Sequence, residues 1–202
     1  DRSLVDAMLK MDEYIDLLVP RGGASLVRFV AENANMPAVT GGIGVCHTYV
    51  DKAADLDMAV EIVHNAKVRR PSICNALDTV LVHADIAAAG LPLMAKELTG
   101  SGVELHCDNR ALSILRLEAL GSALPATEDD WGREFLSLIA AVKVVDSLEE
   151  ALGHIDTYGS GHSEAIITED DAAATRFLDE VDAAAVYVNA STQFTDGGQF
   201  GL

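Results

Sequence analysis

Cys74 is the residue of this sequence that could best act as a nucleophile, because three cations closely precede it. These are Lys67, Arg69 and Arg70. A cysteine reacts as its thiolate, and cations or the backbone N–H groups of a helix start stabilise that anion. The same cations would attract a phosphorylated substrate. The alternative is a structural role, since free cysteine is among the most often buried residue types.

The segments on either side of Cys74 place it at a junction between two elements. Residues 55–68 carry regularly spaced apolar side chains, which predicts a helix, and residues 77–82 form a short apolar run typical of a strand. Functional side chains lie on such connections more often than in cores. We therefore expect a helix and a strand to position the thiol.

Segments typical of strands and of helices alternate along the chain, which predicts an α/β fold with a largely parallel sheet. The predicted strands are residues 15–19, 48–50, 79–82, 103–106, 141–145, 165–168 and 185–188. The predicted helices are residues 3–10, 24–34, 56–68, 86–98, 148–156 and 172–180.

Composition excludes several classes of protein. The 202 residues carry a net charge of −18, which would repel nucleic acid and anionic membranes. No apolar stretch is long enough to cross a bilayer, so we expect no membrane association. Three cysteines without tight spacing do not make a disulfide framework, which favours a reducing, cytoplasmic location. Local cations must offset the acidic charge wherever an anionic substrate binds.

Several separated motifs resemble one enzyme family. They are DEYIDL at 12–17, PRGG at 20–23, RP at 70–71 with CNA at 74–76, AVKVV at 141–145, YGSGH at 158–162 and VNAST at 188–192. Together they resemble the gamma-glutamyl phosphate reductases of the aldehyde dehydrogenase superfamily, in the right order over nearly the whole chain. The segment from Val50 to Ala59 also resembles the part of that superfamily that leads to its nucleophile.

The resemblance implies a fold and a domain organisation. It implies an aldehyde dehydrogenase-like three-layer α/β catalytic domain with a largely parallel sheet, and a remnant of a Rossmann-like cofactor domain. Residues 1–45 are expected to be the C-terminal part of the NADP-binding domain, 46–195 the catalytic domain, and 196–202 a truncated return segment toward the cleft. The chain is therefore expected to be a fragment that is inactive alone.

The implied activity is the NADPH-dependent reduction of L-glutamyl 5-phosphate to L-glutamate 5-semialdehyde and phosphate, in proline biosynthesis. Cys74 would form a thioester with the acyl group, and backbone N–H groups at Cys74 or Asn75 would hold the oxyanion. The resemblance also implies a homo-oligomer when the protein is full length, and possible association with a glutamate kinase.

Five residues are candidates for binding NADPH. Arg21, Gly22, Gly23 and Ser25 lie where a strand is expected to lead into a helix, so backbone N–H groups could approach a phosphate. Such a glycine pair is more often a tight turn. Glu134 matches the superfamily position that binds the nicotinamide ribose, since a carboxylate can accept two hydroxyl hydrogen bonds. The alternative for Glu134 is a solvated surface residue.

The candidate substrate-binding residues are taken mainly from the motifs of the family. They are Arg69, Arg70, His162, Ser163, Asn189, Ser191 and Thr192. Each of the polar loop residues could instead serve only the loop structure. Gln193 stands where the reductases usually carry arginine, so we expect it to mark a lost anion contact.

Two features bear on the alternatives. Gly41 occupies the position of the glutamate that activates water in oxidising aldehyde dehydrogenases, and its lack of a base favours an acyl-phosphate reductase. The alternatives are oxidation of a small aldehyde, or a non-catalytic binding or oligomerisation module.

Cys46 and His47 are adjacent and would point to opposite faces of a strand, so no metal site is expected.

Overall fold

The computed structural model describes residues 3–117, 123–196 and 198, and the chain forms two compact units, Asp1–Ile43 and Gly44–Leu202. The first unit contains α1 (Ser3–Met8) and α2 (Ala24–Asn33), with Leu9, Val30 and Met36 buried. The strand predicted for residues 15–19 is wrong. Within residues 15–19, only Leu18 makes a strand-type pair, a single parallel bridge with Ala38. The described residues of this unit contain no strand that could extend this pairing.

The second unit is a seven-stranded sheet in which every described pairing is parallel. Its strand order is β4-β3-β5-β2-β1-β6-β7. The strands are β1 (His47–Val50), β2 (Thr79–His83), β3 (Glu104–Cys107), β4 (Leu124–Pro125), β5 (Ile139–Val145), β6 (Ser163–Ile167) and β7 (Ala185–Val188). The helices are α3 (Leu56–Val68), α4 (Ala84–Gly100), α5 (Asn109–Leu117), α6 (Leu148–Tyr158) and α7 (Asp171–Glu180), with short 3-10 turns η1 (Glu128–Asp130) and η2 (Thr192–Phe194). The predicted α/β fold with a largely parallel sheet is therefore confirmed.

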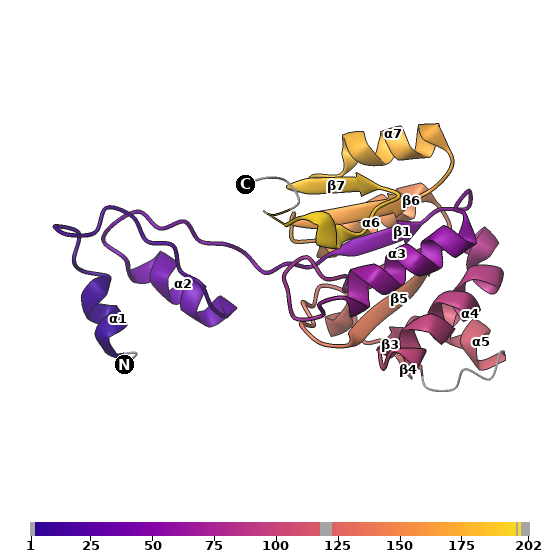
Figure 1. Ribbon diagram of the computed structural model, residues 1–202, viewed down its shortest axis with the longest axis horizontal. Helices are drawn as coiled ribbons and strands as arrows, with labels where there is room; N and C mark the ends of the chain where they lie inside the picture. The colour runs from indigo at the N-terminus through magenta and orange to yellow at the C-terminus, as the bar shows by residue number, and fades with distance from the viewer. Residues whose placement is uncertain (1–2, 118–122, 197, 199–202) are drawn as a thin grey trace. The chain divides into compact units, whose positions relative to one another are not determined.

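Side chains that alternate along the strands divide the core between the two faces of the sheet. Val80 and Val82 pack into the larger cluster with α3, α4 and α5, while Leu81 between them packs on the other face with α6 and α7. Tyr49 and Val50 of β1 divide in the same way. Figure 1 shows α3 and α4 side by side along one face of the sheet. The result is the three-layer arrangement that the family resemblance implied.

The amino-terminal edge of the sheet brings together segments that are far apart in sequence. β1 begins opposite β2 and β6, with His47 paired to Thr79 and Glu164. Thr79 also pairs with Ala141 of β5. The segments that immediately precede these strands must therefore lie side by side, and one of them carries Cys74.

The predicted elements of the second unit agree with the structure to within a few residues at each end, except for two that the patterns did not predict. α5 and β4 were missed. α5 carries its own signal, since the Asp108 side chain accepts a hydrogen bond from Ala111 N and the buried positions Ala111, Leu112 and Leu115 follow at helical spacing. Among the described residues, no helix combines the length and apolarity needed to cross a bilayer.

Candidate active site

The Cys74 thiol lies in an exposed turn between the end of α3 and the start of β2. The turn is closed by a hydrogen bond from Ala76 N to Ile73 O of 3.0 Å. No helix begins at Cys74, so the prediction that a helix start stabilises its thiolate is wrong. The chain must instead reach β2 within a few residues, and it does so through turns.

The start of β1 packs directly against the backbone of Cys74. The Cys46 thiol donates to Cys74 O over 3.3 Å. A Cβ added to Gly44 would lie 1.9 Å from Cys74 O, a distance that no side chain could accommodate, so only glycine fits at this approach. Burial and nearby carboxylates raise the pKa of the Cys46 thiol well above its usual range, which leaves Cys46 as a neutral hydrogen-bond donor.

Glu134 joins the same group of residues. One of its carboxylate oxygens, Oε1, accepts a hydrogen bond of 3.0 Å from Gly44 N, and the residue is half-buried. Ser160 Oγ accepts from the next amide, Val45 N, over 2.8 Å. The carboxylate predicted to bind a ribose is thus placed beside the glycine that contacts Cys74.

A chain of polar side chains leads from the start of β6 to the segment after β7. His162 Nδ1 lies 2.8 Å from Ser163 Oγ, Ser163 Oγ lies 2.7 Å from Thr195 Oγ1, and Thr195 Oγ1 lies 2.9 Å from Tyr187 OH. Thr195 O accepts from Asn75 Nδ2 over 2.6 Å, which connects this series of polar side chains to the residue after Cys74. Burial lowers the pKa of His162, although Glu134 and Glu164 oppose that effect.

The segment after β7 is also fixed to the cysteine turn by Thr192, whose hydroxyl donates to Asn75 O over 2.8 Å. Ser191 Oγ accepts from Gln193 N and caps η2. Ser163, Ser191 and Thr192 are all buried, whereas His162 is half-buried and Arg69 and Arg70 are exposed. The buried hydroxyls therefore support neighbouring residues, and the exposed cations are free to meet an anion.

Known proteins resemble this chain over its whole length, not only in the motifs around Cys74. A gamma-glutamyl phosphate reductase of Dehalococcoides mccartyi is 57% identical over 202 residues, which is 100% of this chain and 48% of that protein. The crystal structure of gamma-glutamyl phosphate reductase from Thermotoga maritima superposes with a TM-score of 0.93 at 50% identity, again over 100% of this chain and 47% of that one. The whole chain is homologous to gamma-glutamyl phosphate reductases.

The chain spans about half the length of the gamma-glutamyl phosphate reductases that it matches. The fold extends to a more distant enzyme, an acetylating aldehyde dehydrogenase from Geobacillus thermoglucosidasius. It shares 21% identity and a TM-score of 0.75 over 98% of this chain and 51% of its own. No protein-family model matches the sequence. The resemblance to the reductases and to the aldehyde dehydrogenase-like fold is confirmed.

Lys67 does not belong to the exposed cations that the sequence placed before Cys74. It is fully buried, its ammonium donates to Leu77 O over 2.8 Å, and Asp78 Oδ1 lies 3.9 Å away. Burial lowers the pKa of Lys67 to about 8, although Asp78 opposes that effect. The helical spacing already carried the signal, because Ala59, Val63 and Ala66 mark the same buried stripe of α3.

The expectation that Gln193 marks a lost anion contact does not agree with its surroundings. It is buried, and its Nε2 donates to Ala66 O over 2.8 Å and to Arg70 O over 3.4 Å. These carbonyls belong to the end of α3 and the turn after it. An amide here satisfies backbone acceptors, and its role is to attach η2 to the segment that leads to Cys74.

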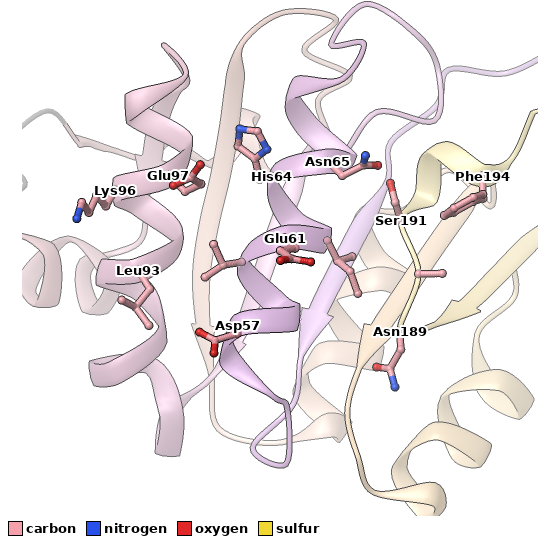
Figure 2. Close-up of a pocket in the computed structure, with 13 residues that line it drawn as sticks. Asp57, Glu61, His64, Asn65, Leu93, Lys96, Glu97, Asn189, Ser191 and Phe194 are labelled. Atoms are coloured by element: carbon pink, nitrogen blue, oxygen red, sulfur yellow. The ribbon is translucent and has the colours of Figure 1, made fainter.

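Asn189 lies at the opposite edge of the sheet from Cys74. It follows the carboxyl end of β7, has a positive φ of 52°, and exchanges two hydrogen bonds with the backbone of Thr168. It also borders a groove beside α3 and α4, together with Ser191 and Phe194 (Figure 2). Its predicted contact with the substrate at Cys74 has no support in this placement.

The candidate phosphate-binding residues Arg21, Gly22, Gly23 and Ser25 all belong to the first unit. They are exposed, and Gly23 is the N-cap residue of α2 with extended φ and ψ of −66° and 160°. Because glycine has no side chain, Gly23 offers no side-chain acceptor to the first N–H groups of α2. That arrangement is compatible with an anion at the helix start.

Proposed function

We propose that the protein reduces L-glutamyl 5-phosphate to L-glutamate 5-semialdehyde and phosphate, and that Cys74 is its nucleophile. The observation that supports this most strongly is the position of Cys74 in a chain that matches the reductases along its full length. Its thiol is exposed, in contrast to the buried Cys46 and Cys107. Burial raises the pKa of the Cys107 thiol to about 12, so Cys107 is unsuited to the same task.

The proposed reaction has two stages at Cys74. The thiolate attacks the acyl carbon, the bond from that carbon to the phosphate oxygen breaks, and phosphate leaves with the electron pair, which gives a thioester. Addition of hydride to the thioester carbon and loss of the sulfur then give the aldehyde and regenerate the thiolate. NADPH, when bound, supplies that hydride.

The exposed cations suit the first stage. Arg69 and Arg70 follow α3 directly and are both exposed, so they can meet the phosphate group of the substrate before and as it leaves. The backbone N–H groups of Cys74 and Asn75 would hold the oxyanion. The Asn75 side chain donates to Thr195 O and so holds the turn against the segment after β7, which leaves its backbone N–H for the proposed oxyanion contact.

Glu134 fits the proposed ribose contact. Its Oε1 is occupied by Gly44 N, and its Oε2 has no hydrogen bond to the described part of the chain, so one oxygen can accept a ribose hydroxyl. Arg21, Gly22, Gly23 and Ser25 would contribute backbone and charged donors to the phosphates of NADPH. The preference for NADPH over NADH rests on the family resemblance.

The proposal includes the wider organisation expected from the family. Residues 1–45 would belong to the cofactor-binding domain and 46–195 to the catalytic domain, and the segment 196–202 lies mostly outside the described residues. A cytoplasmic location, a role in proline biosynthesis, a homo-oligomer and association with a glutamate kinase stay predictions. They follow from composition and resemblance alone.

Replacing Cys74 tests the nucleophile in the protein at its natural length. We expect Cys74→Ala to abolish formation of NADPH from glutamate 5-semialdehyde, phosphate and NADP+, the reverse reaction, while NADPH binding measured by fluorescence is unchanged. Cys107→Ala is the matched control and should retain activity, because that thiol is buried in β3. Activity that survives Cys74→Ala would refute the proposal. Oxidation of other aldehydes without phosphate would favour the aldehyde-oxidising alternative.

A further inference from the structure

Asp78 is a buried carboxylate that contacts three of the segments around Cys74. It lies just before β2 and is 2% exposed. Its Oδ1 accepts a hydrogen bond of 3.0 Å from Phe135 N, and its Oδ2 accepts one of 3.3 Å from Cys46 N. The ammonium of Lys67, in the last turn of α3, lies 3.9 Å from Oδ1. One side chain thus links α3, the segment that enters β1 and the loop before β5.

Two of these segments lead to groups that pack against the backbone of Cys74. Cys46 donates its own thiol to Cys74 O. Phe135 is the neighbour of Glu134, whose carboxylate accepts from Gly44 N. Gly44 in turn packs against the Cys74 carbonyl too closely for any side chain. A shift of either amide that Asp78 holds would therefore be passed to Glu134 or to Cys74.

We propose that Asp78 is a positioning residue that holds Glu134 and the Gly44–Cys46 segment in register against Cys74. It acts through the backbone amides of Phe135 and Cys46 and does not touch the substrate. Its consequence for catalysis rests on the proposed reductase activity, whereas the positioning itself does not.

The chemistry of the site requires a carboxylate. Two N–H donors and an ammonium surround Asp78, and an ionised carboxylate accepts at both oxygens. An amide would accept at one oxygen only and would turn its NH2 group toward one of the two N–H donors. A buried donor without an acceptor costs far more than an exposed one. Asp78→Asn therefore changes hydrogen bonding while it nearly preserves volume.

The surroundings also make this arrangement sensitive to acid. Burial, the largest cause, raises the pKa of Asp78 to about 6, while the amides of Phe135 and Cys46 and the Lys67 ammonium oppose that rise and Glu134 adds to it. Among the described residues, the charged and titratable groups that face Asp78 are Lys67 from α3, Cys46 from the segment before β1 and Glu134 from the loop. Below about pH 6 the carboxyl gains a proton and loses one acceptor.

Amide hydrogen exchange, measured by NMR on this chain, tests the positioning without any assay of activity. We expect Asp78→Asn to speed exchange of Gly44 N–H by about tenfold to a hundredfold, the effect of losing a hydrogen bond to a charged group. In the described part of the chain Gly44 N bonds to Glu134 and not to Asp78, so a defect confined to the partners of Asp78 would leave its exchange unchanged. The matched control is Asp51→Asn, since Asp51 is equally buried but binds Tyr49, Ala53 and Thr168 at the far edge of β1.

Kinetics on the protein at its natural length test the consequence for the reaction. We expect Asp78→Asn to lower kcat by about tenfold to a hundredfold with KM changed little, because the residue positions the site and does not bind substrate. Asp51→Asn should keep the kcat of the unchanged protein. Equal Gly44 exchange and equal kcat in the two variants would overturn the proposal.

Lys67→Met provides a second test in case Asp78→Asn does not fold. Methionine is an unbranched apolar side chain one atom shorter than lysine, so it keeps most of the packing but removes the ammonium, and the carboxyl of Asp78 should bind its proton more tightly. We expect the acid limb of Gly44 exchange and of kcat to move to higher pH. A limb that does not move would overturn the proposal. If Gly44 exchange responds as expected but the unchanged protein does not reduce glutamyl phosphate, only the proposed function fails.

Discussion

The buried residue His154 makes the stability of the protein depend on pH. Its ring lies among Trp131, Tyr158 and His47, with centroid distances of 5.7, 4.7 and 5.4 Å. Burial, together with the nearby His47 and Lys143, lowers the pKa of His154 to about 3. The native state therefore holds this imidazole neutral at pH values where the unfolded chain would protonate it.

This difference predicts a loss of stability in acid. Because the native pKa lies below the unfolded value of about 6.5, the stabilisation is complete above that value and decreases as the pH falls toward 3. One group of this kind costs up to about 2 kcal/mol of unfolding free energy between about pH 6.5 and pH 5. We expect His154→Phe to reduce the loss, as measured by urea unfolding at both pH values. An unchanged pH dependence would show that His154 titrates normally in the folded protein.

Individual site residues were predictable to different degrees. A motif singled out Cys74 and a match of position in the family singled out Glu134, and their roles stay predictions. Lys67 could have been recognised as buried from the spacing of α3. The roles of Gln193 and Asp78 could not be predicted, since they bond to backbone groups of segments far away in sequence. A hydrogen bond to a distant backbone leaves no local pattern in the sequence.

Among the elements, α3 has the most direct connection to the site because it ends where the turn to Cys74 begins. Asp55 caps it, with Oδ1 accepting from Met58 N over 2.8 Å. We expect Asp55→Ala to lower the free energy of unfolding by about 1 kcal/mol, and Asp55→Asn to restore most of it. Asp57→Ala is the control, since Asp57 lies in the same turn without serving as the cap and should cost only a few tenths. Urea unfolding of the four proteins checks this, and equal losses for both alanine variants would contradict it.

The same cap explains why the bounds of α3 could be predicted to the residue. Asp55 marks the start, the apolar stripe fixes the body, and Pro71 closely follows the end. Residues 15–19 show the opposite case, because their apolar side chains resemble a strand, yet Leu17 and Val19 are exposed and only Leu18 pairs. A strand needs a neighbour, and local sequence does not reveal whether one is present.

At the scale of the whole molecule, the residues at the amino ends of the strands differ in role from those at the carboxyl ends. Ligands of open α/β sheets usually bind at the carboxyl ends of the strands. Here Cys74, Glu134, His162 and Asp78 gather at the amino-terminal edge of the second unit, as the pairing of its strands requires. The carboxyl edge holds Asp51 and Asn189 in hydrogen bonds to Thr168, which close loops there.

The second unit contains everything that this arrangement requires, which predicts that it folds alone. All three hydrophobic clusters consist of residues at or after Tyr49. The contacts of Cys74 with Gly44 and Cys46 also lie within residues 44–202. A domain of this size buries enough surface to fold cooperatively. We expect residues 44–202, produced without residues 1–43, to unfold in a single urea transition that is the same by circular dichroism and by Trp131 fluorescence. In that fragment, Leu81→Ala should lower the midpoint by removing about 2–5 kcal/mol of core packing, because Leu81 is fully buried. Transitions that differ between the two probes, or a midpoint that Leu81→Ala does not change, would show that the core of this unit does not form without the preceding residues.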